Sequence, residues 1–155
     1  ADSAVRRELA EALRGQGHWD EALALIEEGV AAAPGDESLQ TARGELLLAR
    51  NEAEARAATG RGDAAEAERL QKERADLELQ DLSRRSAAHP ADLALRVRLA
   101  KACYKAGRTD QAVSELRVLN DELAGAGTTG SLPQAVGATL KQLQPARPRR
   151  ATRPL

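Results

Sequence analysis

The chain has 155 residues, with 23 basic and 24 acidic side chains and 42% hydrophobic residues, which suits one folded domain with a buried core. Its apolar residues are mostly Ala and Leu, while Phe and Met are absent and Trp and Tyr occur once each. Because Ala and Leu favour helices and strand-forming residues are scarce, we expect an all-α fold. The formal net charge of −1 argues against general attraction to nucleic acid, and no apolar run reaches the ~20 residues of a transmembrane helix.

The first two predicted helices are joined by Gly15-Gln-Gly17. The first runs from about Ser3, a candidate N-cap, to Arg14. Its apolar face carries Val5, Leu9, Ala12 and Leu13 at helical spacing. The second begins near Trp19 and ends before Pro34, because proline disfavours a helical conformation in the residue preceding it. Its apolar face carries Leu23, Ile26 and Val30.

Two long helices are predicted next, joined by Gly60-Arg-Gly62. Asp36 is expected to cap the first, which extends from Glu37 to Thr59. Asp63 is expected to cap the second, which extends to about Ala88. The apolar stripe of the second helix consists of Leu70, Leu77 and Leu82, with Ala67 and Ala75 beside it.

Three shorter helices complete the prediction. Asp92 caps the fifth, which ends at Gly107, and the sixth runs from Thr109 or Asp110 to about Leu123. After a glycine-rich loop, a seventh helix extends from roughly Pro133, with Ser131 as a candidate cap, to Leu143. Its apolar face, Val136, Leu140 and Leu143, suits it to closing the end of a helical stack. Residues 145–155 contain three prolines and four arginines, and we expect them to be extended.

An internal repeat with an offset of 90 positions relates residues 9–26 to residues 99–116. The first copy carries Leu9, Ala10, Ala12, Gly17, Asp20 and Ala22, and the second carries Leu99, Ala100, Ala102, Gly107, Asp110 and Ala112. Ile26 corresponds to Leu116. Such self-similarity is typical of repeat architectures, in which each unit buries its apolar face against its neighbours.

The repeated pattern resembles the tetratricopeptide repeat (TPR), a unit of 34 residues that forms two antiparallel helices. Small residues let the paired helices touch, glycine makes the turn, and large apolar residues fill the seam between repeats. The resemblance implies repeats at 3–36, 37–92 and 93–124, which together form the region 1–124. A loop and capping helix follow at 125–144, and a basic tail at 145–155.

The middle repeat is longer than the family pattern. Pro34 and Pro90 lie 56 positions apart, so the unit has 22 residues more than the standard 34. Divided between two helices, the surplus extends the hairpin by roughly 16 Å at 1.5 Å per residue. The hairpin is either a variant repeat with no role of its own or a contact element for oligomerisation or a partner.

The resemblance also implies that the first helix of each pair lines a concave groove that receives a peptide. In the third pair the groove-facing positions would be Ala94, Val97, Arg98, Lys101, Tyr104 and Lys105. The candidate partner-binding residues among them are Arg98, Lys101, Tyr104 and Lys105, which suit an acidic or C-terminal carboxylate ligand. The lysine and asparagine of carboxylate-clamp TPRs are replaced here by Arg7 and Glu11, and only Arg98 matches that clamp. The alternative is an ordinary solvated basic face.

Arg147, Arg149, Arg150 and Arg153 are further candidates, for contact with phosphate, an acidic protein or an anionic membrane. Without them the chain has 19 basic and 24 acidic side chains, a net charge of −5. No aromatic residue interleaves them, so they offer no base stacking. The alternative is a solubilising tail without a partner.

The remaining reactive residues predict neither catalysis nor a metal site. His18 and His89 are expected in turns, and their separation gives no zinc signature. Trp19 is expected to pack in the core, and Cys103 to be a small buried residue. No glycine loop for phosphate is present, and no cofactor is predicted. We therefore predict a chain that is not an enzyme.

The function expected from these features is a protein-interaction scaffold or adaptor within a larger assembly, bound to another protein or to a second copy of itself. The alternatives are a structural subunit of a filament or shell, a TPR segment of a thioredoxin-like co-chaperone and, third, a nucleic-acid adaptor acting through the tail. Because the sequence has no Met, we expect a processed protein or a segment of a longer one. The compartment stays open between the bacterial cytoplasm and, after processing, the periplasm or exterior.

Overall fold

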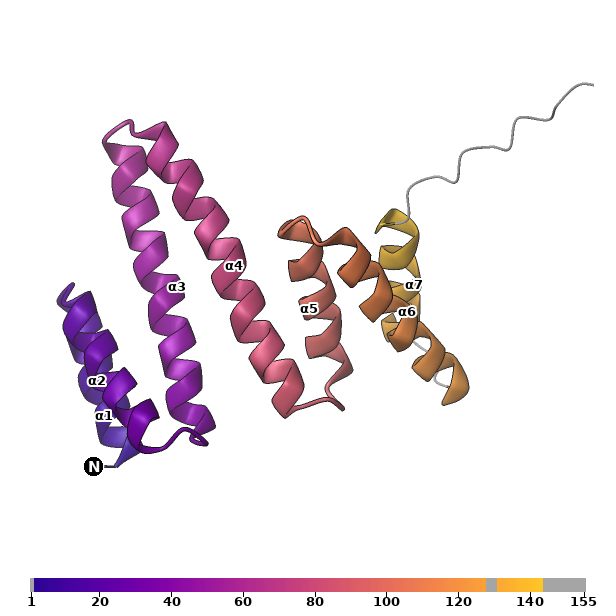
Figure 1. The fold of residues 1–155 in the computed structure, drawn as a ribbon, viewed down its shortest axis with the longest axis horizontal. Coiled ribbons are helices and arrows are strands. Elements are labelled where there is room, and N and C mark those ends of the chain that lie inside the picture. The colour runs from indigo at the N-terminus through magenta and orange to yellow at the C-terminus, as the bar shows by residue number, and fades with distance from the viewer. Residues whose placement is uncertain (1, 128–130, 144–155) are drawn as a thin grey trace, which may run out of the picture. The chain divides into compact units, whose positions relative to one another are not determined.

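The computed structural model describes residues 2–127 and 131–143, and this part of the chain is all-α, as predicted (Figure 1). The helices are α1 (Ser3–Gly15), α2 (Trp19–Ala32), α3 (Glu37–Gly60), α4 (Ala64–Ala88), α5 (Leu93–Lys105), α6 (Thr109–Gly125) and α7 (Ser131–Leu143). The chain divides into two compact units, Ala1–Asp81 and Leu82–Leu155, and the boundary falls within α4.

In the first unit, α1 packs on α2 and α3, and α2 packs on α3. The core residues shared by these helices are Ala10, Ala22, Leu23, Ile26, Leu39 and Leu46. Asp36 caps α3 as predicted, because its carboxylate accepts hydrogen bonds from the backbone N–H groups of Ser38 (2.9 Å) and Leu39 (3.1 Å). The Ser3 hydroxyl also donates to this carboxylate, so Asp36 joins the beginnings of α1 and α3.

The long hairpin of α3 and α4 begins beside α2 and, in Figure 1, extends past the ends of α1 and α2. Helix α3 has 24 residues and α2 has 14, so α3 is about 15 Å longer at 1.5 Å per residue. Asn51 is buried between the two long helices, and its Nδ2 donates to the Leu70 carbonyl oxygen at 3.1 Å. The sequence pattern did not predict this buried polar residue.

In the second unit, α5 packs on α6 and α7, and α6 packs on α7. Its core includes Leu99, Cys103, Leu116, Leu119 and Val136. Val136 lies 90 positions after Leu46, which is buried in α3. The side chains of Ser131, Pro133 and Leu143, which the sequence placed at the start and on the apolar face of the last helix, lie outside the described residues.

The same turn recurs in all three hairpins. Gly17, Gly62 and Gly107 lie 45 positions apart, and each has a positive φ between 74° and 81°, a region in which side chains beyond hydrogen are strained. The N–H of the residue after each glycine donates to a carbonyl five positions earlier, as in His18 to Leu13 (2.9 Å) and Arg108 to Cys103 (2.8 Å). The middle hairpin therefore keeps the repeat's turn although its helices are longer.

Several local predictions were wrong. The N-cap of α1 is Asp2 rather than Ser3, since its carboxylate accepts from the Ala4 N–H at 3.1 Å. On α4, Leu70 and Leu82 are buried as predicted, but the third buried leucine is Leu79, and Leu77 is only half-buried. Val5, Leu9 and Ala12 are exposed, because α2 and α3 cover the side of α1 that carries Ala10 and leave this apolar stripe open.

Candidate functional site

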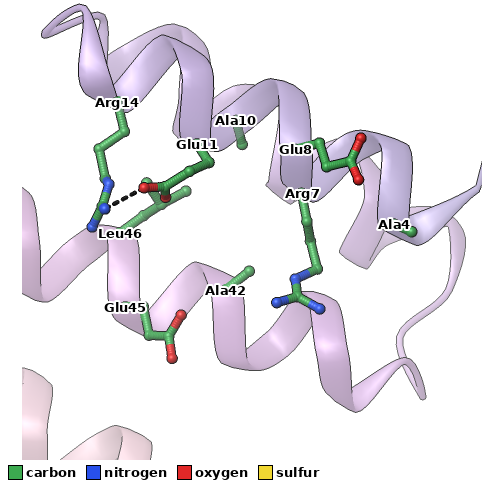
Figure 2. A pocket seen from close by; sticks show the side chains of 9 residues that line it. All are labelled: Ala4, Arg7, Glu8, Ala10, Glu11, Arg14, Ala42, Glu45 and Leu46. Atoms are coloured by element: carbon green, nitrogen blue, oxygen red, sulfur yellow. Dashed lines mark hydrogen bonds and ion pairs between the residues drawn. The ribbon is translucent and has the colours of Figure 1, made fainter.

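A groove of about 490 Å³ lies between α1 and α3 in the first unit (Figure 2). Its wall on α1 consists of Ala4, Arg7, Glu8, Ala10, Glu11 and Arg14, and its wall on α3 consists of Ala42, Glu45 and Leu46. Ala10 and Leu46 are buried and form an apolar floor. The charged side chains stand around that floor, so the groove can accommodate a partner segment with both apolar and charged residues.

The charges of this groove largely compensate one another. Arg14 forms an ion pair with Glu11, and Arg7 donates to the Ser38 hydroxyl at 2.9 Å. Figure 2 shows the Arg7 side chain reaching from α1 toward Ala42 on α3, with Glu45 on the same helix. Two arginines and three glutamates give the groove a formal charge of −1. Its electrostatic preference for an anionic or cationic ligand is therefore weak.

Five exposed or groove-lining positions of α1 have equivalents 90 residues later on α5. Ala4, Arg7, Glu8, Glu11 and Arg14 correspond to Ala94, Val97, Arg98, Lys101 and Tyr104. These α5 residues are the ones that the sequence placed on a groove-facing side. The internal repeat thus relates the groove wall observed on α1 to the face predicted on α5.

The structure brings Arg98, Lys101, Tyr104 and Lys105 together on one exposed side of α5. Val97 was predicted to share this side, but it is an apolar residue that is buried in the core of the second unit. We call the four exposed residues the cationic face. Residues three or four positions apart on a helix are neighbours, so Lys101 lies one turn from both Arg98 and Lys105.

The charges of the cationic face are not compensated within the described part of the chain. Arg98, Lys101 and Lys105 form no ion pair with any described residue, and Tyr104 is 48% exposed on the same side of the helix. Arg96, which lies elsewhere on α5, is instead held by Glu122 at 2.6 Å and 3.3 Å. The cationic face can therefore pair with carboxylates supplied by another molecule.

The arginines predicted as a basic site in the tail, Arg147, Arg149, Arg150 and Arg153, lie outside the described residues. Within residues 2–127 and 131–143, no group of His, Cys, Asp and Glu is arranged to hold a metal ion. Cys103 is buried as predicted, and burial raises the pKa of its thiol, which suppresses the reactive thiolate. Trp19 is half-buried, and His18 is exposed with Nδ1 2.9 Å from a Glu21 carboxylate oxygen.

Comparison with family models identifies the fold. Two models of the tetratricopeptide repeat match the chain, one over residues 3–46 and the other over residues 93–117. Their first residues, 3 and 93, are separated by the same 90 positions as the internal repeat. The chain is a TPR-like helical repeat protein. Searches of curated proteins and of solved structures each find no match.

The two TPR matches cover α1 and its equivalent α5, and they leave the long hairpin unmatched beyond residue 46. TPR repeats are protein–protein interaction modules and are typically non-enzymatic. The protein is accordingly an interaction module with two related helix faces of different charge. No helix in the described residues is both long and apolar enough to cross a membrane.

The TPR resemblance placed Arg7 and Glu11 of α1 at groove positions, but the sequence analysis named no other groove residue of the first unit. Its wall on α3, which includes Ala42 and Glu45, was absent from the predicted site. The sequence does contain information that identifies the α1 wall. Subtracting the repeat offset of 90 from the predicted α5 positions gives residues of α1 that line the groove. The contribution of α3 depends on how that helix packs, which the repeat alone does not encode.

Proposed function

We propose that this TPR-like protein is a non-enzymatic adaptor that binds an acidic segment of a partner protein on the cationic face of α5. The observation that carries the proposal is the set of three cations, Arg98, Lys101 and Lys105, which surround an exposed tyrosine and have no acidic partner among the described residues. Helix α5 is also the second copy of a helix whose corresponding side lines a groove.

The side chains of the cationic face favour a partner segment with several carboxylates, in either a helical or an extended conformation. The Arg98 guanidinium can hold a carboxylate through two parallel hydrogen bonds, while the ammonium groups of Lys101 and Lys105 act as less directional charges. The Tyr104 ring offers an apolar surface and a hydroxyl for the partner's backbone. Such contacts are exposed and will weaken with salt.

An adaptor role within an assembly follows from the contrast between the two faces. The groove of α1 and α3 carries compensated charges, whereas the cationic face of α5 carries an excess of positive charge. One chain can therefore engage two chemically different segments, one on each face. We include the four tail arginines as additional attraction for an acidic partner, which alanine substitution of all four would reduce at low salt.

The test is a binding titration of the full chain with a fluorescein-labelled hexaglutamate peptide, followed by fluorescence anisotropy. We expect the double substitution Arg98→Glu and Lys101→Glu to weaken binding by about tenfold or more, equivalent to about 1.4 kcal/mol. The matched control is Arg108→Glu with Arg117→Glu, which makes the same change in net charge at exposed positions of the second unit outside the cationic face.

The control variant should retain most of the affinity of the unsubstituted chain. Equal losses in both variants would show that the peptide responds only to net charge, and the proposed site would be wrong. Absence of binding by the unsubstituted chain at low salt would also contradict it. Circular dichroism of each variant verifies that the helices remain folded.

A further inference from the structure

A second groove lies on the hairpin of α3 and α4, in the part that extends past α1 and α2 (Figure 1). Its volume is about 830 Å³, and its walls run from Asn51 to Thr59 on α3 and from Ala64 to Arg74 on α4, with Gly62 in the turn. No described residue of α1 or α2 lines it. Several lining residues are small, so a helix of another molecule can approach closely. We call this surface the hairpin groove.

Asn51 lines the hairpin groove and carries an unpaired acceptor. The residue is 3% exposed, and one N–H of its side-chain amide donates to the Leu70 carbonyl oxygen at 3.1 Å. Its Oδ1 is shielded from solvent and accepts no hydrogen bond from a described residue. A buried acceptor without a donor destabilises the state that contains it. A molecule seated in the groove can supply the missing donor.

The unpaired oxygen is not needed to link the paired helices. The equivalent bond of the first hairpin lies 45 positions earlier, the spacing of the turn glycines, where Arg6 of α1 donates to the Leu25 carbonyl oxygen of α2 at 3.2 Å. The equivalent residue of the third hairpin is Arg96. Arginine has donor groups only, so the other two hairpins place a donor without an acceptor here. The elongated hairpin alone has a residue at this position that can also accept.

The charges that line the hairpin groove sum to zero, since they belong to two glutamates and two arginines. Glu52 pairs with Arg56 on α3 and with Arg74 on α4, the latter at 3.5 Å, and Glu68 pairs with Lys72 at 2.7 Å. A strongly acidic or basic segment therefore gains little from this surface. The best-matched occupant offers a neutral donor surrounded by balanced charges. A second copy of the same groove has both properties.

We propose that the hairpin groove is the contact surface of a homodimer, in which two hairpins pack about a two-fold axis close to Asn51. Both copies use the same patch in a two-fold contact, so a group at the axis must complement itself. The Asn51 amide does so, because two facing amides can each donate their unused N–H and accept on their unpaired oxygen. The broad χ2 torsion of asparagine lets the amide turn toward the groove. A single buried asparagine also fixes the register of helices in coiled coils.

The size of the surface predicts a weak dimer. Ten residues of helix extend about 15 Å, and two neighbouring helices are about 20 Å wide, which gives roughly 300 Å² per copy. Stable complexes bury about 800 Å² per partner. We therefore expect reversible association at high protein concentration, which sedimentation equilibrium of the full chain measures between about 10 μM and 1 mM.

A charge placed in the groove tests the surface. Ala55 lines the groove and is half-buried, whereas Ala57 lies on the same helix, is exposed and does not line it. We expect Ala55→Lys to raise the dissociation constant of the dimer by about tenfold or more. Ala57→Lys makes the same change in charge and should leave that constant within about threefold. Thr59→Lys, at an exposed groove position, repeats the test if Ala55→Lys lowers the helix content measured by circular dichroism.

The Asn51 amide provides a second readout. Its side-chain N–H signals in an amide correlation spectrum are assigned by their absence in Asn51→Ala. We expect these signals to shift with protein concentration along the same curve as the sedimentation data, because the amide gains a partner in the dimer. Unchanged Asn51 signals in a chain that dimerises would contradict the pairing of the two amides.

Three other results would overturn the proposed dimer. They are a chain that stays monomeric up to about 1 mM, equal weakening by Ala55→Lys and Ala57→Lys, and a dimer that only Leu9→Lys disrupts, which would assign association to α1. The proposal does not rest on acidic-segment binding by the cationic face. Hexaglutamate should bind Ala55→Lys and Ala57→Lys with equal affinity, so each proposal can fail while the other holds.

Discussion

The two copies of the repeat have the same turn and equivalent core residues. They differ on two other sides of their first helix, which is α1 in one copy and α5 in the other. Gly17 and Gly107 adopt the same positive φ, and Ile26 and Leu116 are both fully buried. On the groove side, Glu8 and Glu11 of α1 become Arg98 and Lys101 on α5. On the other side, the exposed apolar stripe of α1 corresponds to buried residues of α5. Packing fixes the core of a repeat, while its surface is free to acquire separate binding preferences.

The largest effect is expected where the two copies agree. Ile26→Ala and Leu116→Ala each remove a fully buried side chain and should each lower the free energy of unfolding by about 2–5 kcal/mol. Urea unfolding followed by circular dichroism measures the loss. A loss below about 1 kcal/mol at either position would show that Ile26 and Leu116 are not equivalent core residues of the two copies.

A smaller and unequal effect is expected on the stripe. Leu99→Ala should cost about 2–3 kcal/mol, because Leu99 is buried, whereas Leu9→Ala at the exposed equivalent should cost less than about 1 kcal/mol. The same urea titration compares the two variants. Equal costs would mean that α1 is covered in solution, by a second copy or otherwise, and the comparison between the copies would have to be revised.

The charge difference can be reversed to sharpen the comparison. Glu8→Lys with Glu11→Lys gives α1 the charges of α5 at equivalent positions, and it should create weak binding of hexaglutamate at a second site, within about tenfold of the α5 affinity. Anisotropy in the Arg98→Glu and Lys101→Glu background isolates the new site. No gain of binding would show that charge alone does not account for the cationic face.

The smallest effect concerns pH and belongs to the first copy alone. The hydrogen bond from the Ser3 hydroxyl, followed by that from the Leu39 N–H, holds the pKa of Asp36 below its usual 3.8. The equivalent position of the second copy is Ala126. Because the folded pKa is below the unfolded one, the stabilisation is present above pH 3.8 and is lost as pH falls through the folded pKa.

Removal of the Ser3 hydroxyl isolates this contribution. Ser3→Ala should lower the urea midpoint at neutral pH and have little effect at a pH below the folded pKa of Asp36, where the carboxyl is protonated in both states. Urea titrations at the two pH values provide the comparison. An equal loss at both would indicate that Ser3 stabilises α1 without acting through the Asp36 carboxylate.

The sequence predicted what short stretches of chain determine. Turns and helix caps are formed by residues that are close in sequence, such as the turn glycines Gly17 and Gly107 and the capping residues Asp36 and Asp92. The helix boundaries were therefore predicted to within a few residues. The side of α5 that carries Arg98 and Lys101 was expected from the TPR resemblance, and both residues are exposed. Helical periodicity identifies an apolar side of a helix but does not show whether another helix packs on it. The exposure of Leu9 was therefore not predicted.

Other features depend on packing between segments distant in the sequence. Asn51 is polar and sits in a helix with many charges, so nothing local distinguishes it as a buried residue bonded to the Leu70 carbonyl. The choice of Leu79 over Leu77 on α4 reflects how that helix is rotated against its neighbours. The α3 wall of the groove likewise appears only once α1 and α3 are packed together.

The most direct test of the central claim is an amide chemical-shift titration of the isotopically labelled full chain with hexaglutamate peptide at low salt. The account predicts saturable shifts concentrated on α5 at Arg98, Lys101, Tyr104 and Lys105, with Glu8 and Glu11 of α1 unaffected. Shifts centred on α1, or small shifts spread evenly over basic residues of both units, would contradict the assignment of α5 as the face that binds acidic segments.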